Sequence, residues 1–228
     1  MYVTLLYTLF PMTAAIAGAT VALFRQPGEK TMSLIHHFTA GVIFSAAATE
    51  VLPGLKEQSM VAVIAGGVTG VVLMMLIQHY GAKAAAGFGM LAAIGIDIFI
   101  DGLVLGISFA AGAKTGMMLT LALTLEILFL GLSVVEELKN MLGSKIRVLM
   151  AVAGIALLLP IGALVGTPVA KLGDVWLAFF LSFGLVALLY LVTEELLVEA
   201  HKDGRDTPLG TAMFFAGFMI LMLIEHSL

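Results

Sequence analysis

The 228-residue sequence contains no cysteine and few charged residues. The lack of cysteine excludes disulfide bonds and thiolate metal sites. Only 11% of the residues are charged, whereas a soluble globular domain carries about 25%. The hydrophobic fraction is 61% and the mean hydropathy is +1.12. Because the shortage of charge extends along the whole chain, the sequence predicts a polytopic membrane protein surrounded by membrane lipid.

The sequence also lacks basic runs, low-complexity segments and long linkers, and its net charge is only −4. We therefore expect no nucleic acid partner, and a single domain that spans residues 1–228. A transmembrane β-barrel would require segments of about ten residues that alternate apolar and polar side chains. Stretches such as Val148 to Leu159 are apolar on every side instead. This pattern favours helices.

Apolar runs of about 20 residues are separated by short polar or glycine-containing turns. They predict an all-α polytopic membrane protein with eight transmembrane helices. We expect these helices near residues 2–24, 32–55, 60–80, 87–112, 116–138, 146–167, 174–199 and 208–227.

Lysine and arginine are distributed unevenly between the loops. Of the 11, only Lys56, Lys114 and Lys171 lie in loops that follow even-numbered helices. The positive-inside rule predicts that the odd-numbered loops face the cytoplasm. Both termini would then lie on the extracytoplasmic side of the cell (inner) membrane.

Three acidic residues occupy the middle of two hydrophobic spans: Asp97 and Asp101 in the fourth, and Glu126 in the fifth. Neither span contains an internal Lys or Arg to neutralise them. A carboxylate at the bilayer centre costs about 2.5–3.5 kcal/mol on insertion scales. Residues four apart share one face of a helix, so the two aspartates repel unless a cation or a proton lies between them. The pattern indicates a cation site, with structural hydrogen bonding and a metal-free proton relay as alternatives.

The two acidic segments resemble each other in sequence. The segment Asp97-Ile98-Phe99-Ile100-Asp101-Gly102-Leu103 aligns with Glu126-Ile127-Leu128-Phe129-Leu130-Gly131-Leu132. Weak similarity between antiparallel helices is typical of an inverted repeat, which places a transport site near the midplane. We therefore expect an inverted-repeat arrangement with the metal site between the fourth and fifth helices.

A second group of polar residues gathers at the predicted cytoplasmic side. Glu136 and Glu137 are expected to close the fifth helix there. Imidazole and carboxylate groups both bind metals, so the cluster suggests a release path for a cation, although solvated helix ends are an equally good interpretation. The residues of this possible transport path are His36, His37, Glu194, Glu195, Glu199 and His201.

These motifs resemble the ZIP (Zrt-, Irt-like protein) family of divalent metal transporters over essentially the whole chain. The fourth helix looks like the family motif His-Asn-x-Pro-Glu-Gly, and the fifth looks like His-Glu-x-x-Glu-Gly. The segments His37-Phe38-Thr39-Ala40-Gly41-Val42 and Glu50-Val51-Leu52-Pro53 are similar to the second helix of the family. The segment Thr193-Glu194-Glu195-Leu196 with Glu199-Ala200-His201 is similar to its seventh. The resemblance implies eight helices, both termini outside, and transport of a divalent cation toward the cytoplasm.

Several positions depart from the family pattern. Ile98 stands in place of the motif asparagine, Ile127 in place of a polar residue, and Leu130 in place of the fifth-helix glutamate. Some family members bind two metals side by side, and here the ligands of the second site are missing. The resemblance therefore implies one site, with Asp97, Asp101 and Glu126 as its ligands.

The sequence thus predicts a transporter with a transition-metal ion (Zn, Mn or Fe type) as its substrate and with no organic cofactor. Three carboxylates without a histidine favour hard cations, although Zn²⁺ also accepts carboxylates. The alternatives are a proton-coupled transporter of another solute and a metal sensor without flux. An enzyme is not expected, because two aspartates on one helix suit ligation better than an aspartyl dyad. A homodimer is possible.

Overall fold

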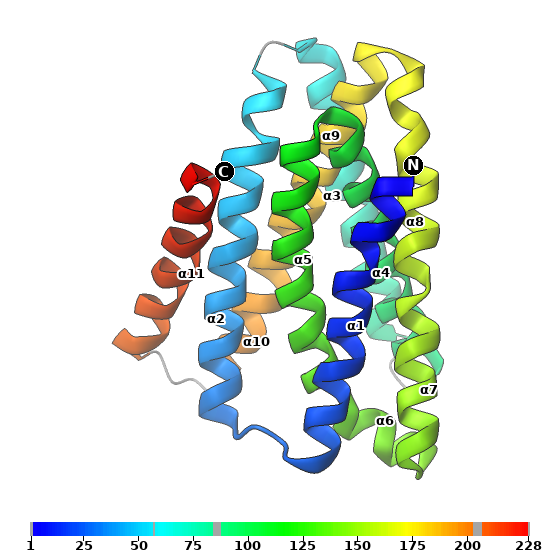
Figure 1. Cartoon of the computed structure of the whole chain (residues 1–228), viewed down its shortest axis with the longest axis vertical. Coiled ribbons are helices and arrows are strands. Elements are labelled where there is room, and N and C mark those ends of the chain that lie inside the picture. Colours follow the sequence, from blue (N-terminus) through cyan, green and yellow to red (C-terminus); the bar gives the residue numbers. More distant parts are fainter. Residues whose placement is uncertain (1, 57, 84–87, 203–206, 228) are drawn as a thin grey trace.

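The computed structural model describes residues 2–56, 58–83, 88–202 and 207–227. Within these residues it is helical and contains no strand. Eight helical spans are long and apolar enough to cross a membrane, which confirms the predicted number and makes the chain a multi-pass membrane protein. The spans run roughly parallel to the long axis of one bundle (Figure 1).

The first five spans are formed mostly by single helices. These are α1 (Tyr2–Phe24), α2 (Glu29–Ala46), α3 (Met60–Lys83), α4 (Phe88–Ala111) and α5 (Ala113–Ser133). A short helix, α6 (Val135–Leu142), follows α5. The sixth span consists of α7 (Lys145–Ala156), α8 (Leu158–Gly166) and a 3-10 turn (Thr167–Leu172), the seventh contains α9 (Asp174–Tyr190) and α10 (Leu197–His201), and the eighth is α11 (Pro208–Ser227).

Two spans differ from the prediction, the fifth in where its helix ends and the sixth in its continuity. The fifth helix does not continue to residue 138, because α5 ends at Ser133 and Glu136 and Glu137 belong to the separate helix α6. The sixth span is interrupted at Leu157, three residues before Pro160. A proline ring clashes with the carbonyl group four residues earlier, here that of Ala156, which explains the break.

The second and seventh spans each contain a π-helical segment that the sequence did not predict. Ala47–Val51 extends α2, and Leu191–Leu196 joins α9 to α10. π-Bulges inside α-helices occur often at functional sites. The first segment carries Glu50, and the second carries Glu194 and Glu195. Both segments therefore present carboxylates within otherwise regular spans.

The most extensive helix contacts are α1 with α5, α4 with α8, α2 with α11, and α3 with α9. Glycines allow several of these pairs to approach at backbone distance. A Cβ atom on Gly18 of α1 would lie 2.0 Å from the carbonyl oxygen of Leu128 in α5. Conversely, a Cβ atom on Gly131 of α5 would lie 2.4 Å from that of Ala15 in α1. The helix that carries Glu126 is thus fixed closely against α1.

The two ends of the bundle differ in charge. Both chain termini lie toward the upper end in Figure 1, which we call the terminal end. We call the other end, where α1 is connected to α2, the basic end. It carries Arg25, Lys30, Lys139, Lys145, Arg147 and Lys202. Exposed apolar side chains cover the outward faces of α1, α3 and α11, as expected of surfaces that contact lipid.

Candidate metal centre

The structure brings together the three carboxylates of the fourth and fifth spans. Asp97 and Asp101 lie one turn apart on the same face of α4, and Glu126 lies on the adjacent helix α5. One carboxylate oxygen from each residue lies within 4.8 Å of the others. This spacing allows a single ion to contact all three groups.

Few protein groups compensate for the negative charge of these carboxylates. Asp101 and Glu126 are only 4% and 5% exposed, and Asp97 is half-buried. The atoms Oδ2 of Asp101 and Oε2 of Glu126 have no hydrogen-bond partner in the part of the chain that the structure describes. No ion pair among those residues reaches the three acids. Two unit charges about 4 Å apart repel by about 4 kcal/mol at an effective dielectric constant of about 20, so the cluster is suited to hold a cation.

A fourth carboxylate, that of Glu195, lies close enough for its charge to act on all three acids. Its side chain is exposed and belongs to the π-helical segment after α9. Sequence reasoning assigned Glu195 to the transport path and not to the centre. In the sequence, the only indication that Glu195 could reach the centre was its position more than a turn before the predicted end of the seventh helix.

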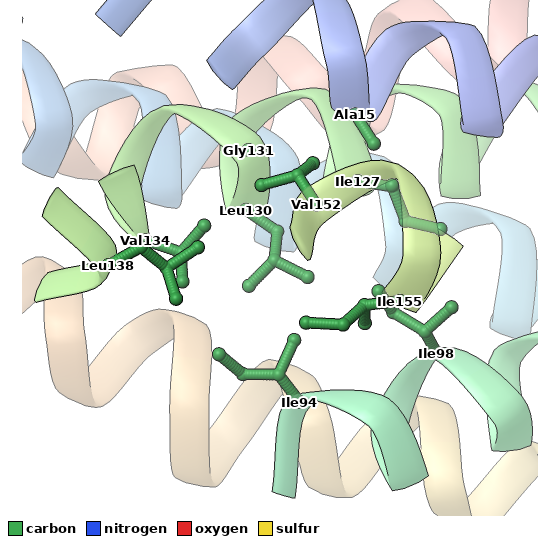
Figure 2. A pocket seen from close by; sticks show the side chains of 10 residues that line it. All are labelled: Ala15, Ile94, Ile98, Ile127, Leu130, Gly131, Val134, Leu138, Val152 and Ile155. Atoms are coloured by element: carbon green, nitrogen blue, oxygen red, sulfur yellow. The ribbon is translucent and has the colours of Figure 1, made fainter. Parts of the chain in front are cut away.

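An apolar cavity of about 20 Å³ lies beside the cluster. The side chains of Ile98, Ile127 and Leu130 point into it (Figure 2). All of its lining residues are apolar: Ala15, Ile94, Ile98, Ile127, Leu130, Gly131, Val134, Leu138, Val152 and Ile155. Apolar cavities of this kind stay dry. The positions at which the ZIP motifs carry polar ligands are therefore filled here by hydrocarbon, with no donor for a second ion.

A larger cavity of about 480 Å³ opens at the basic end. His36 and Glu199, two of the predicted path residues, line it together with Glu136 of α6. Glu199 also forms an ion pair with Lys202 at 3.1 Å. The cavity therefore brings α2, α6 and α10 to one polar space.

The other predicted path residues surround this cavity less directly. The ring of His37 packs edge-on against that of His201, with 4.8 Å between the centroids. His37 Nδ1 lies 2.8 Å from the carbonyl oxygen of Ser33, so that Nδ1 carries the proton when the ring is neutral. Glu194 is exposed and belongs neither to the cavity lining nor to the carboxylate cluster.

Lys114, to which sequence reasoning gave no role beyond its place in a loop, connects α5 to α11 at the terminal end. Its ammonium group donates a hydrogen bond to the main-chain carbonyl of Glu225 at 3.1 Å and lies 3.8 Å from the carboxylate of the same residue. Glu50 lies within electrostatic range of both residues. A protein cation thus lies beside two carboxylates at this end.

Two characterised proteins are similar to this chain. The zinc transporter ZIPB of Bordetella bronchiseptica is 31% identical over 131 residues, which cover 56% of this chain and 41% of that protein. The zinc transporter GufA of Myxococcus xanthus is 27% identical over 151 residues, which cover 66% of this chain and 59% of that protein. The match thus spans about half the length of these relatives. No family model matches the chain. The two relatives confirm the predicted resemblance to the ZIP transporters.

Proposed function

We propose that this chain, a divergent relative of the ZIP transporters, moves a divalent metal cation across the membrane. Asp97, Asp101 and Glu126 bind the cation between α4 and α5, near the middle of the bundle. The protein supplies the binding groups and the change of access, and the metal ion is the substrate. The protein does not need to catalyse a chemical reaction.

One observation carries this proposal. Three carboxylates from two adjacent membrane-spanning helices converge within 4.8 Å, and two of them each have a buried oxygen without a hydrogen-bond partner among the described residues. Intramembrane acids that serve only as structural contacts pair with a donor on a neighbouring helix. These acids instead face one another, an arrangement that a cation stabilises.

The ligand chemistry limits the choice of ion. An all-oxygen centre suits Mn²⁺, Fe²⁺ and Mg²⁺, and Zn²⁺ also accepts carboxylate ligands. The names of both relatives favour zinc. We therefore propose a transition-metal ion of the Zn, Mn or Fe type, bound at one site, because the adjacent cavity offers no polar ligand.

The direction of transport is proposed from charge and from the larger cavity. The basic end faces the cytoplasm under the positive-inside rule, which leaves both termini outside. The cavity at that end provides a release route along His36 and Glu199. His37, His201, Glu194 and Glu195 lie on α2, α10 and the π-helical segment that border this route. The cation would thus leave the three carboxylates toward the cytoplasm.

The helix pairing supports an inverted repeat. Span one packs on span five as span six packs on span four, and span two packs on span eight as span seven packs on span three. Spans one, two and three correspond to spans six, seven and eight, and span four corresponds to span five. Replacing each span by its counterpart converts each pair into the other pair. It also reverses the direction of every helix. The site lies where the two central helices of this arrangement meet, as in other inverted-repeat transporters.

Uptake into proteoliposomes tests the proposal, with Zn²⁺, Mn²⁺, Fe²⁺, Co²⁺, Cd²⁺ and Mg²⁺ supplied separately. We expect saturable uptake of one or two of these ions by the wild type. Asp101→Asn and Glu126→Gln remove a charge with almost no change of shape, so both variants should fold and lose uptake. Asp174→Asn, at the exposed start of α9, serves as a matched control.

The same experiment separates the alternatives. Normal uptake by Asp101→Asn would overturn the site. A folded wild type that binds metal without flux would favour a sensor. Flux of another solute that requires Asp101 but no metal would favour proton coupling.

A further inference from the structure

Seven buried polar side-chain atoms have no hydrogen-bond partner among the described residues. All of them belong to only three elements: α2 with its π-helical extension, α4 and α5. They are His36 Nδ1, Thr39 Oγ1, Ser45 Oγ, Glu50 Oε1, Asp101 Oδ2, Ser108 Oγ and Glu126 Oε2. Because α5 packs against both α2 and α4, the atoms other than Ser45 Oγ can share one space. Ser45 lies one turn after Gly41, which packs against Phe214 of α11, so it points toward α11 instead.

Three of these atoms are hydroxyl oxygens that the proposed function has not used. Thr39, Ser45 and Ser108 are each completely buried. A hydroxyl group in a membrane helix usually donates to the carbonyl of the preceding turn. Thr120 does so at 2.7 Å, and Ser182 donates across helices to the carbonyl of Val63 at 2.7 Å. Unpaired hydroxyls of this kind require another explanation.

The order of the unpaired polar groups along the helices provides an explanation. Both α2 and α4 run from the basic end to the terminal end (Figure 1). On one face of α2 the order is His36, Thr39, Glu50, which begins at the cavity of the basic end. On α4, Ser108 follows Asp101 by seven residues, so it lies on the same face and about 10 Å nearer the terminal end.

We propose that the hydroxyl group of Ser108 lines the outer part of the cation route, between Glu50 and the three carboxylates. Thr39 lines the inner part, between the carboxylates and the cavity at the basic end. A hydroxyl oxygen is a neutral ligand for a divalent cation or for the water that the cation retains. This assignment rests on the proposed function and adds the groups that the ion contacts before and after the carboxylate centre.

The buried state of Ser108 has a consequence for access. In this conformation the large cavity opens at the basic end, and Ser108 is 0% exposed. Its side chain becomes accessible to water only when the terminal end opens. Ser182, which is also buried but packs α9 against α3, stays protected in both states.

The absence of cysteine from the chain makes this testable without further engineering. The single variants S45C, S108C and S182C are reconstituted in both orientations, and a charged methanethiosulfonate reagent is added. Modification is measured by mass spectrometry, and Zn²⁺ or Mn²⁺ uptake by the wild type is measured in parallel. We expect S108C to react about tenfold or more faster than S182C and than S45C, whose side chain points toward α11, since labelling follows the population of the open state.

The transported ion should also protect the cysteine of S108C. At a concentration of about ten times its Kd, an ion that occupies the route should slow this modification about tenfold. Equal rates for the three variants would overturn the proposal, as would reaction of S108C without protection by any transported ion. Uptake by the wild type without labelling of S108C would refute the hydroxyl route and leave the transport proposal intact. Labelling of S108C without uptake of any ion by the wild type would refute the transport proposal.

Discussion

A Cβ atom on Gly102 of α4 would lie 2.0 Å from the main-chain carbonyl oxygen of Leu159 in α8. The contact is reciprocal, because a Cβ atom on Gly162 of α8 would lie 2.1 Å from the carbonyl oxygen of Phe99. Gly102 directly follows Asp101. The position of this carboxylate is therefore set by contact between two backbones.

The first prediction concerns this contact. Gly102→Ala should force α4 and α8 apart and cost about 1–3 kcal/mol, as overpacking of a close contact does. The measurement is thermal unfolding in detergent, where we expect the Tm to fall by several degrees. Gly154→Ala is the matched control, because nothing lies within 4 Å of a Cβ atom there. An equal effect of both substitutions would contradict the interpretation.

The second prediction concerns stabilisation by metal. A ligand that binds only the folded state at about 100 times its Kd stabilises that state by about 2.7 kcal/mol. We expect saturating Zn²⁺ or Mn²⁺ to raise the Tm of the wild type and of Asp174→Asn. The same ion should leave the Tm of Asp97→Asn and Glu126→Gln nearly unchanged. A full metal-dependent rise in Glu126→Gln would show that the ion binds elsewhere.

The third prediction concerns the apolar cavity. Leu130→Glu would place a carboxylate against hydrocarbon and near three other acids, which should cost several kcal/mol without metal. In differential scanning, its Tm should be the lowest in metal-free buffer and should rise more than that of the wild type when cation is added. Leu130→Gln has a similar volume and no charge, so it should show no added response to metal. An unchanged metal-free Tm for Leu130→Glu would count against the described environment.

The fourth prediction concerns Lys114. Its exposed ion pair with Glu225 should contribute only about 0–1 kcal/mol to stability. Lys114→Gln, however, removes the positive charge that lies beside Glu50 and Glu225, so initial uptake at low ionic strength should increase. The difference should disappear near 0.1 M salt, where the Debye length is about 10 Å. Lys171→Gln, also exposed at the terminal end, should have a smaller effect.

The sequence predicted the eight spans because apolar length alone determines them, and their ends agree with the structure within a few residues except near Ser133. It did not predict the π-helical segments, since a π-bulge leaves no periodicity in residue types. It also joined α6 to α5. It placed Glu136 and Glu137 at the end of the fifth helix, because the break near Val134 depends on the packing of α6 against α7.

For the candidate centre, the spacing of Asp97 and Asp101 predicted a shared face, and the depth of Glu126 suggested that it lies nearby. The structure shows this proximity, and the role of the three residues in binding metal stays a prediction. The approach of Glu195 could not be predicted, because its direction depends on the π-helical segment. The unpaired hydroxyl of Ser108 could likewise not be predicted, because serine in a membrane helix normally bonds to its own backbone.

The apolar cavity has an evolutionary consequence. Ile98, Ile127 and Leu130 come from two helices and line the same apolar cavity. If an ancestor carried polar ligands at these positions, the first reversal would place a polar atom among the remaining hydrocarbon side chains. Each single step back toward a two-ion centre would therefore pass through a less stable protein. Once the cavity had become apolar, selection for stability would have opposed the return of polar side chains there.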